Sequence, residues 1–117
     1  MEKSDDIQTE KRFGNLISLK VLYLATNPIT NLPTTFGRLS NLKVLNIKNN
    51  NLQEIPDLIG GCANLKELMA WNNEIKQVKP GIGKCTNLRE LHLYNNLIRH
   101  LPEAFGEMEM MRRCDLQ

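Results

Sequence analysis

The fold can be read from the stretch Leu42-Lys43-Val44-Leu45-Asn46-Ile47-Lys48-Asn49-Asn50-Asn51-Leu52, because the spacing of its apolar residues and Asn returns every 23 residues. The shared pattern is Leu-x-x-Leu-x-Leu-x-x-Asn-x-Leu, with occasional substitution by Ala or Ile. Complete copies begin at Leu19, Leu42, Leu65 and Leu88, and a degraded copy begins at Met111. A fixed period of this length indicates stacked units that contact only their neighbours and bury one continuous core. Such an array predicts a binding surface rather than an active site.

Each repeat is expected to form one short strand. Leu45 and Ile47 alternate with other residues, the period of a strand with one buried face. We predict parallel strands near residues 21–25, 44–48, 67–71 and 90–94, with a possible fifth near 113–116. We also expect a column of asparagines to bond buried backbone where the chain turns. Its members are Asn27, Asn50, Asn73 and Asn96.

The segment that returns the chain to the next strand is too short for a long helix. Pro33 fixes φ, and Gly37 would allow an exit with positive φ. Short 3-10 or single-turn helical pieces are therefore predicted on the convex side. Lys79 stands where other repeats have Pro, and we expect it to loosen one turn.

In these motifs the chain resembles the intracellular leucine-rich repeat subfamily with consensus LxxLxLxxNxLxxLPxxFGxLxN. That subfamily includes Ras-pathway scaffold proteins and plant intracellular proteins, and the resemblance covers Phe13 to Leu116. It implies an α/β fold: a right-handed solenoid with a curved parallel sheet and short helices on the convex side. The expected organisation is a polar lead-in over residues 1–12 and a repeat domain over residues 13–117, with four full repeats and a partial fifth.

Composition narrows the class of partner. The net charge is +2, which is too small to argue for nucleic acid or a membrane surface. No apolar stretch approaches the roughly 18–20 residues that span a bilayer, and the first residues lack the apolar region of a secretory signal. We therefore expect a protein partner, with no nucleic acid and no membrane.

The cysteines favour a reducing compartment. Cys62 and Cys85 are 23 residues apart, in the slot that Leu39 and Met108 fill in other repeats. We interpret both as small buried hydrophobic residues, with a disulfide between adjacent coils as the alternative. Since no CxxC pair or flanking cysteine cluster is present, a cytoplasmic location is expected.

Outward positions of the strands form the predicted concave binding face. The only Trp and both Tyr fall there, and Trp and Tyr are enriched at binding hot spots. Trp71 and Tyr94 should be substantially exposed and side by side. The alternative is that aromatic residues simply suit strands. The predicted partner-binding residues are Tyr23, Lys48, Met69, Trp71, His92 and Tyr94.

A basic residue precedes the outward positions in every repeat. This column could attract an acidic partner or an anionic surface; the alternative is a solvated edge position. Its members are Lys20, Lys43, Lys66, Arg89 and Arg112.

Catalytic chemistry has little support. His92 and His100 lack a Cys or Ser partner with a third orienting group, and the scattered histidines and cysteines do not make a zinc set. Since the glycines do not form a phosphate-binding loop, we expect no catalytic residues, cofactor or metal.

The predicted function is a non-enzymatic protein-interaction module or scaffold in signalling. The alternative is a regulatory or substrate-recognition segment of a larger multidomain signalling protein.

The C-terminal end concentrates adaptable apolar side chains. We expect this end to be covered by another chain or by further residues of a longer chain, and self-association is one way to cover it. The alternative is an ordinary degenerate last repeat. The residues concerned are Met108, Met110, Met111, Cys114 and Leu116.

Overall fold

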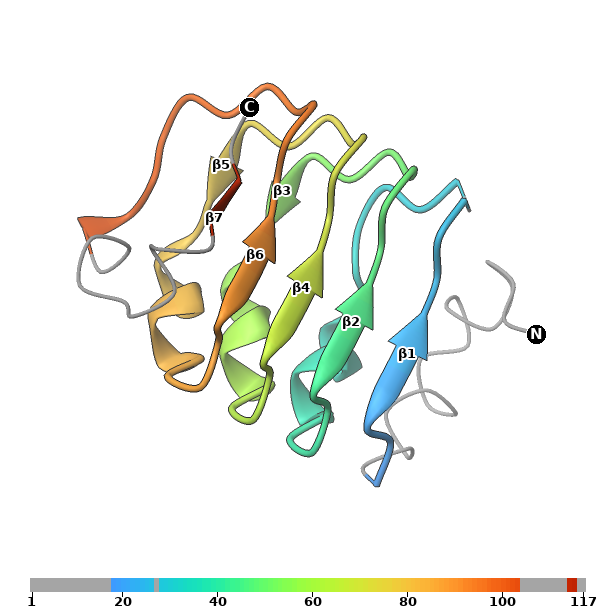
Figure 1. Cartoon of the computed structure of the whole chain (residues 1–117), viewed down its shortest axis with the longest axis vertical. Helices are drawn as coiled ribbons and strands as arrows, with labels where there is room; N and C mark the ends of the chain where they lie inside the picture. The colour runs from blue at the N-terminus through green and yellow to red at the C-terminus, as the bar shows by residue number, and fades with distance from the viewer. Residues whose placement is uncertain (1–17, 27, 104–113, 116–117) are drawn as a thin grey trace.

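Successive repeats each add one strand to a single parallel sheet in the computed structural model, which describes residues 18–26, 28–103 and 114–115. Leu22, Leu45, Leu68 and Leu91 lie in register across neighbouring strands, so the offset between strands equals the repeat. The sheet confirms the parallel pairing, including a fifth strand (Figure 1). In spatial order its strands are β1 (Val21–Tyr23), β2 (Val44–Asn46), β4 (Glu67–Met69), β6 (Glu90–His92) and β7 (Cys114–Asp115).

The strands β1, β2, β4 and β6 end two residues earlier than predicted, although backbone bonding between coils continues beyond them. The N–H of Thr26 donates to the carbonyl oxygen of Lys48 at 3.1 Å. The chain then leaves the extended conformation because one residue per coil adopts φ near +60°. Asn tolerates this left-handed conformation better than most residues. The residues are Thr26, with φ of 62°, and Asn49, Asn72 and Asn95, with φ of 58–59°.

Short 3-10 helices return the chain on the side opposite the sheet, as predicted (Figure 1). They are η1 (Thr34–Arg38), η2 (Asp57–Gly61) and η3 (Pro80–Lys84). A second parallel sheet has two strands, β3 (Glu54–Ile55) and β5 (Gln77–Val78). In the sequence, each of these strands lies between a strand of the main sheet and the next 3-10 helix. This sheet could not be predicted from the sequence, because two residues are too few to show a period.

Two glycines of the 3-10 helices are required for close packing and not for the positive φ that was predicted for glycine in this segment. Gly37 was expected to use positive φ, but none of the described glycines does so. The helices instead pack so closely that a Cβ at Gly61 would lie 1.9 Å from the carbonyl oxygen of Gly37. At Gly81 it would lie 2.2 Å from the carbonyl oxygen of Asp57. Glycine is therefore needed at these two positions for close approach of neighbouring coils.

The prediction that Lys79 loosens a turn is wrong. Helix η3 has five residues, as η1 and η2 do. Pro80 supplies the fixed φ at the first turn of η3. Because Lys79, unlike Pro, keeps its N–H, it donates to the carbonyl oxygen of Ile55 at 2.9 Å. This bond joins two neighbouring coils.

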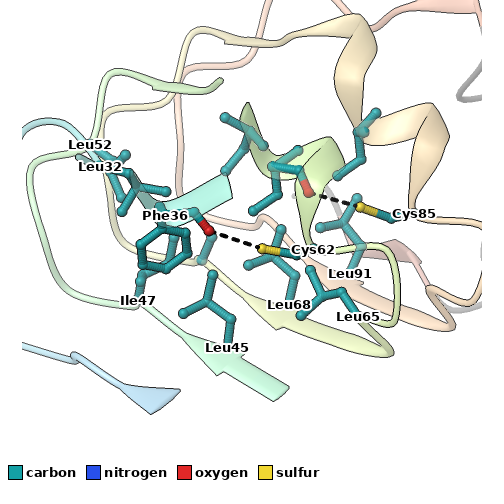
Figure 2. Close-up of a cluster of buried hydrophobic side chains, with 14 of the residues drawn as sticks. Leu32, Phe36, Leu45, Ile47, Leu52, Cys62, Leu65, Leu68, Cys85 and Leu91 are labelled. Atoms are coloured by element: carbon teal, nitrogen blue, oxygen red, sulfur yellow. Dashed lines mark hydrogen bonds between the residues drawn. The ribbon is translucent and has the colours of Figure 1, made fainter. Parts of the chain in front are cut away.

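A continuous apolar core fills the space between the main sheet and the helices (Figure 2). Leu45, Leu68 and Leu91 are fully buried, as predicted. Cys62 and Cys85 are buried and free, which excludes the disulfide between them. Their thiols donate to the carbonyl oxygens of Phe36 and Ile59 in the preceding coil, at 3.7 and 3.3 Å (Figure 2).

The asparagine column bonds buried backbone as predicted. Asn73 Nδ2 donates to the carbonyl oxygens of Ile47 and Ala70, both at 3.0 Å, and its Oδ1 accepts the Leu52 N–H at 3.0 Å. Asn50 and Asn96 make equivalent bonds in their own coils. Each asparagine thus joins its own coil to the preceding one. The first member of the column, the lead-in and the C-terminal methionines lie outside the described residues.

Candidate functional site: the open face of the sheet

One face of the main sheet packs on the core, and the other, here called the open face, carries the residues between the buried positions. In β1, Val21 and Tyr23 are 45% and 61% exposed, whereas Leu22 is buried. The same alternation recurs in β2, β4 and β6. All six predicted binding residues therefore lie at outward positions, either on strands or two residues after the end of a strand.

Four of these residues form a packed group, here called the aromatic cluster: Lys48, Trp71, His92 and Tyr94. The rings of Trp71 and Tyr94 stack with centroids 5.3 Å apart and planes 9° apart. His92 meets Trp71 edge-on at 5.9 Å and 87°, and Lys48 Nζ lies 5.1 Å from the centroid of a Trp71 ring. Stacking, edge-to-face and cation–π contacts each contribute about 0.5–1.5 kcal/mol at such sites. The cluster is therefore ordered before any partner arrives.

The prediction of substantial exposure for Trp71 and Tyr94 is correct only in part. The two rings are side by side as expected, but both are half-buried. Each ring covers the other, and Lys48 and His92 cover Trp71 further. The sequence placed these residues in one column but could not show that they would pack on one another.

Acidic residues border the aromatic cluster. Glu67 and Glu90 are register neighbours in β4 and β6, and both are half-buried. His92 Nε2 lies 3.2 Å from Glu90 Oε1. Met69 is the register neighbour of His92 and is also half-buried. This half of the open face thus combines aromatic, thioether and carboxylate groups.

Tyr23 is separate from the cluster. It is the most exposed large hydrophobic side chain among the described residues and lies in β1, where its register neighbour is Asn46. The structure therefore does not bring it to the aromatic cluster. With Val21 it forms a more apolar end of the open face.

An asparagine ladder that sequence reasoning missed runs along the rim directly after the aromatic cluster. Asn72 Nδ2 donates to Asn49 Oδ1 at 2.7 Å, and Asn95 Nδ2 donates to Asn72 Oδ1. These are the residues with positive φ, so backbone and side chains together fix the rim. The signal was available, since Asn precedes the repeat asparagine in three consecutive repeats.

The described part of the predicted basic column forms an exposed line at the start of the strands. Lys20, Lys43, Lys66 and Arg89 each directly precede a strand, and all four are exposed. The N–H groups of Lys43, Lys66 and Arg89 each donate to the carbonyl oxygen of the preceding member, at 2.7–2.9 Å. We call these four residues the basic row.

The described residues contain no group of three or more His, Cys, Asp or Glu side chains that could hold a metal ion. They also contain no helix with the length and hydrophobicity needed to cross a bilayer. His100 is exposed and distinct from the pair formed by His92 and Glu90.

Comparison with known proteins agrees with this architecture. The sequence matches the family described as "Leucine-rich repeat region" over residues 2–117. The chain is a leucine-rich repeat protein. Its right-handed solenoid of parallel strands and 3-10 turns is the fold of that family. A search of curated protein sequences found no match to this chain.

Solved structures show the same fold within longer chains. A leucine-rich repeat protein of Leptospira interrogans is 28% identical with a TM-score of 0.84, and the matched region spans 90% of this chain and 27% of the Leptospira chain. Internalin C2 of Listeria monocytogenes is 28% identical with a TM-score of 0.77, covering 90% of this chain and 45% of its own. A plant peptide hormone receptor in complex with RGF2 is 25% identical with a TM-score of 0.73. That match covers 89% of this chain and 18% of the receptor.

Proposed function

We propose that this leucine-rich repeat chain is a non-enzymatic module that holds a partner protein against the open face of its sheet. The observation that carries the proposal is the aromatic cluster, in which Trp71 and Tyr94 are stacked and fixed by their neighbours. An ordered aromatic surface loses little conformational entropy when a partner covers it. Met69 and Tyr23 extend the proposed contact surface along the same face.

Two further observations support a protein as the partner. Leucine-rich repeats are generic protein-interaction modules, and the plant receptor was solved in complex with RGF2. Glu67 and Glu90 lie on the open face, where they would repel the phosphates of nucleic acid or an anionic membrane. A scaffold role in signalling follows as the more specific form of the proposal.

The alternative function is a regulatory or substrate-recognition segment of a larger multidomain signalling protein. The chain spans between 18% and 45% of the length of the three solved structures described above. Under this alternative, the partner-binding role belongs to a longer protein. The full-length gene sequence around this segment discriminates between the two. A flanking catalytic domain would favour the alternative.

We further propose that the chain works in the reducing environment of the cytoplasm. The support is that Cys62 and Cys85 lie in adjacent coils as free, buried thiols. Microscopy of the fluorescently tagged full-length protein tests this, and a signal confined to the cell exterior would contradict it.

Self-association through the C-terminal coil is a separate proposal. The core position filled by Val78, which is 4% exposed, is filled in the next coil by Leu101, which is 39% exposed. A second copy that covers this apolar position would form a two-fold dimer. Light scattering over a concentration range should show dimers in the wild type and monomers for Met111→Lys. A wild type that is monomeric throughout would leave the proposal without support.

The main proposal is tested by cross-linking capture from cell extract. We compare wild type with a Trp71→Ala, Tyr94→Ala double variant and with Leu97→Ala, which shortens an apolar side chain that is 54% exposed outside the strands. The double variant should keep its fold and lose captured proteins, with each ring worth about 2 kcal/mol or more of binding energy. The control should capture like the wild type. An unchanged capture profile for the folded double variant would refute the proposal.

A further inference from the structure

We infer that the basic row binds an extended acidic segment of the partner protein, laid across the starts of the strands. The inference rests on the proposed function and specifies the chemistry of the partner. Lys20, Lys43, Lys66 and Arg89 carry four positive charges on consecutive coils. Within the described part of the chain, no carboxylate forms an ion pair with any of the four.

The spacing of the row concentrates positive potential along one line. Neighbouring parallel strands lie about 4.8 Å apart, so the row is about 14 Å long. Like charges at neighbouring positions repel one another. The backbone positions of neighbouring members of the row lie within the ~10 Å screening length at ordinary ionic strength. An anionic partner would relieve this repulsion along the whole row at once.

An extended peptide matches this length. Its side chains alternate between two sides, and residues on the same side are about 6.6 Å apart. Acidic residues at three alternate positions would therefore span about 13 Å, close to the length of the row. The predicted recognition sequence has acidic residues at every second position rather than in one block.

The column beside the row sets the direction of the segment and favours a peptide over a polyphosphate. Next to the row stand Val21 and Val44 in β1 and β2, and Glu67 and Glu90 in β4 and β6. The two carboxylates would repel an anion that carries a charge at every unit more strongly than a segment whose acidic residues alternate with uncharged ones. Val21, 45% exposed, offers an apolar contact at the other end. We therefore place an apolar residue of the segment over β1 and β2.

The chain offers a matched control for charge reversal. Lys76 and Arg99 are also exposed, lie in adjacent coils and are joined by a bond from the N–H of Arg99 to the carbonyl oxygen of Lys76 at 2.8 Å. They lie away from the open face, near β5. The pair Lys66→Glu, Arg89→Glu and the pair Lys76→Glu, Arg99→Glu thus change the net charge equally, in neighbouring coils of the same array.

The test measures fluorescence anisotropy of a labelled peptide with Glu at alternate positions, Ser between them and Val beside the first Glu. At low ionic strength wild type should bind it, and added salt should weaken binding. Reversal of Lys66 and Arg89 should lower the affinity roughly tenfold or more, against less than about twofold for the control pair. A peptide of the same composition with its Glu residues in one block should bind several-fold more weakly.

Several results would overturn the inference: no binding of the alternating peptide by wild type, equal loss for the two reversed pairs, or equal binding of the two peptides. Tighter binding of an oligothymidylate strand or of phosphatidylserine vesicles would replace the peptide with nucleic acid or lipid. The cross-linking capture separates this inference from the proposed function. Capture that needs Trp71 and Tyr94 but not Lys66 and Arg89 defeats the acidic-segment inference alone.

Discussion

At the residue scale, the asparagine column stabilises the coils because one amide side chain bonds two segments of backbone. Asn73 accepts from Leu52 and donates to Ile47 and Ala70, and it is itself 8% exposed. Loss of the amide would leave a buried donor and two acceptors with fewer partners. Such unsatisfied groups cost about 1–3 kcal/mol each.

We therefore expect Asn73→Ala to lower the free energy of unfolding by about 2 kcal/mol or more. Asn72→Gly is the control, because Asn72 is exposed and Gly accepts its φ of 59° without strain. Its effect should be below about 1 kcal/mol. Urea unfolding followed by circular dichroism measures both. Similar losses for the two variants would contradict the assigned role of the buried amide.

The buried thiols predict a specific alkaline instability. Burial raises the pKa of Cys62 from 9.0 to about 12 and that of Cys85 from 9.0 to about 11. Below pH 9 the folded and unfolded chains both keep these protons. Between pH 9 and about pH 11 the unfolded chain releases protons that the folded chain retains, so stability falls as pH rises.

The expected decline approaches roughly 1 kcal/mol per pH unit for each thiol within that window. A Cys62→Ala, Cys85→Ala variant in a Cys114→Ser background should show a shallower decline than the Cys114→Ser parent. Urea midpoints at a series of alkaline pH values provide the measurement. Parallel curves for the two proteins would show that these thiols do not titrate as described.

At the element scale, the 3-10 helices depend on glycine because their backbones touch. A Cβ at Gly61 would lie 1.9 Å from the Gly37 carbonyl oxygen, whereas a Cβ at Gly37 would lie 3.2 Å from that of Leu58. Gly61→Ala should therefore destabilise the protein by about 2 kcal/mol or more. Gly37→Ala should have a much smaller effect. Comparison of the thermal midpoints tests this, and equal midpoints would refute the packing argument.

At the scale of the whole molecule, stability comes from contacts between neighbouring coils. Leu68 is fully buried, and its strand β4 pairs with both β2 and β6. Leu68→Ala should cost about 2–5 kcal/mol. A short array has few neighbour interfaces, so the variant should unfold over most of its length. Hydrogen exchange and thermal melting measure the extent and midpoint of this loss.

Leu97→Ala is the matched control, since the same truncation occurs at a residue that is 54% exposed. It should shift stability by less than about 1 kcal/mol. An unchanged melting midpoint for Leu68→Ala would show that this residue does not form part of the core.

The repeat, the parallel sheet and the inward leucines could be predicted from the sequence, because a fixed period repeats one local pattern in every coil. Leu22, Leu45 and Leu68 lie in register for that reason. The asparagine column was predictable on the same grounds. Open-face positions, including Trp71 and Tyr94, followed from the alternation of side chains along each strand.

The contacts between neighbouring coils became apparent in the tertiary structure. It showed that Gly61 is needed for close approach and that the Lys79 N–H joins two coils. It also showed that Trp71 and Tyr94 are half-buried against each other, where sequence alternation had indicated substantial exposure. A local pattern fixes which way a side chain points. Distances between coils depend on contacts between residues far apart in the chain, and no single repeat encodes them.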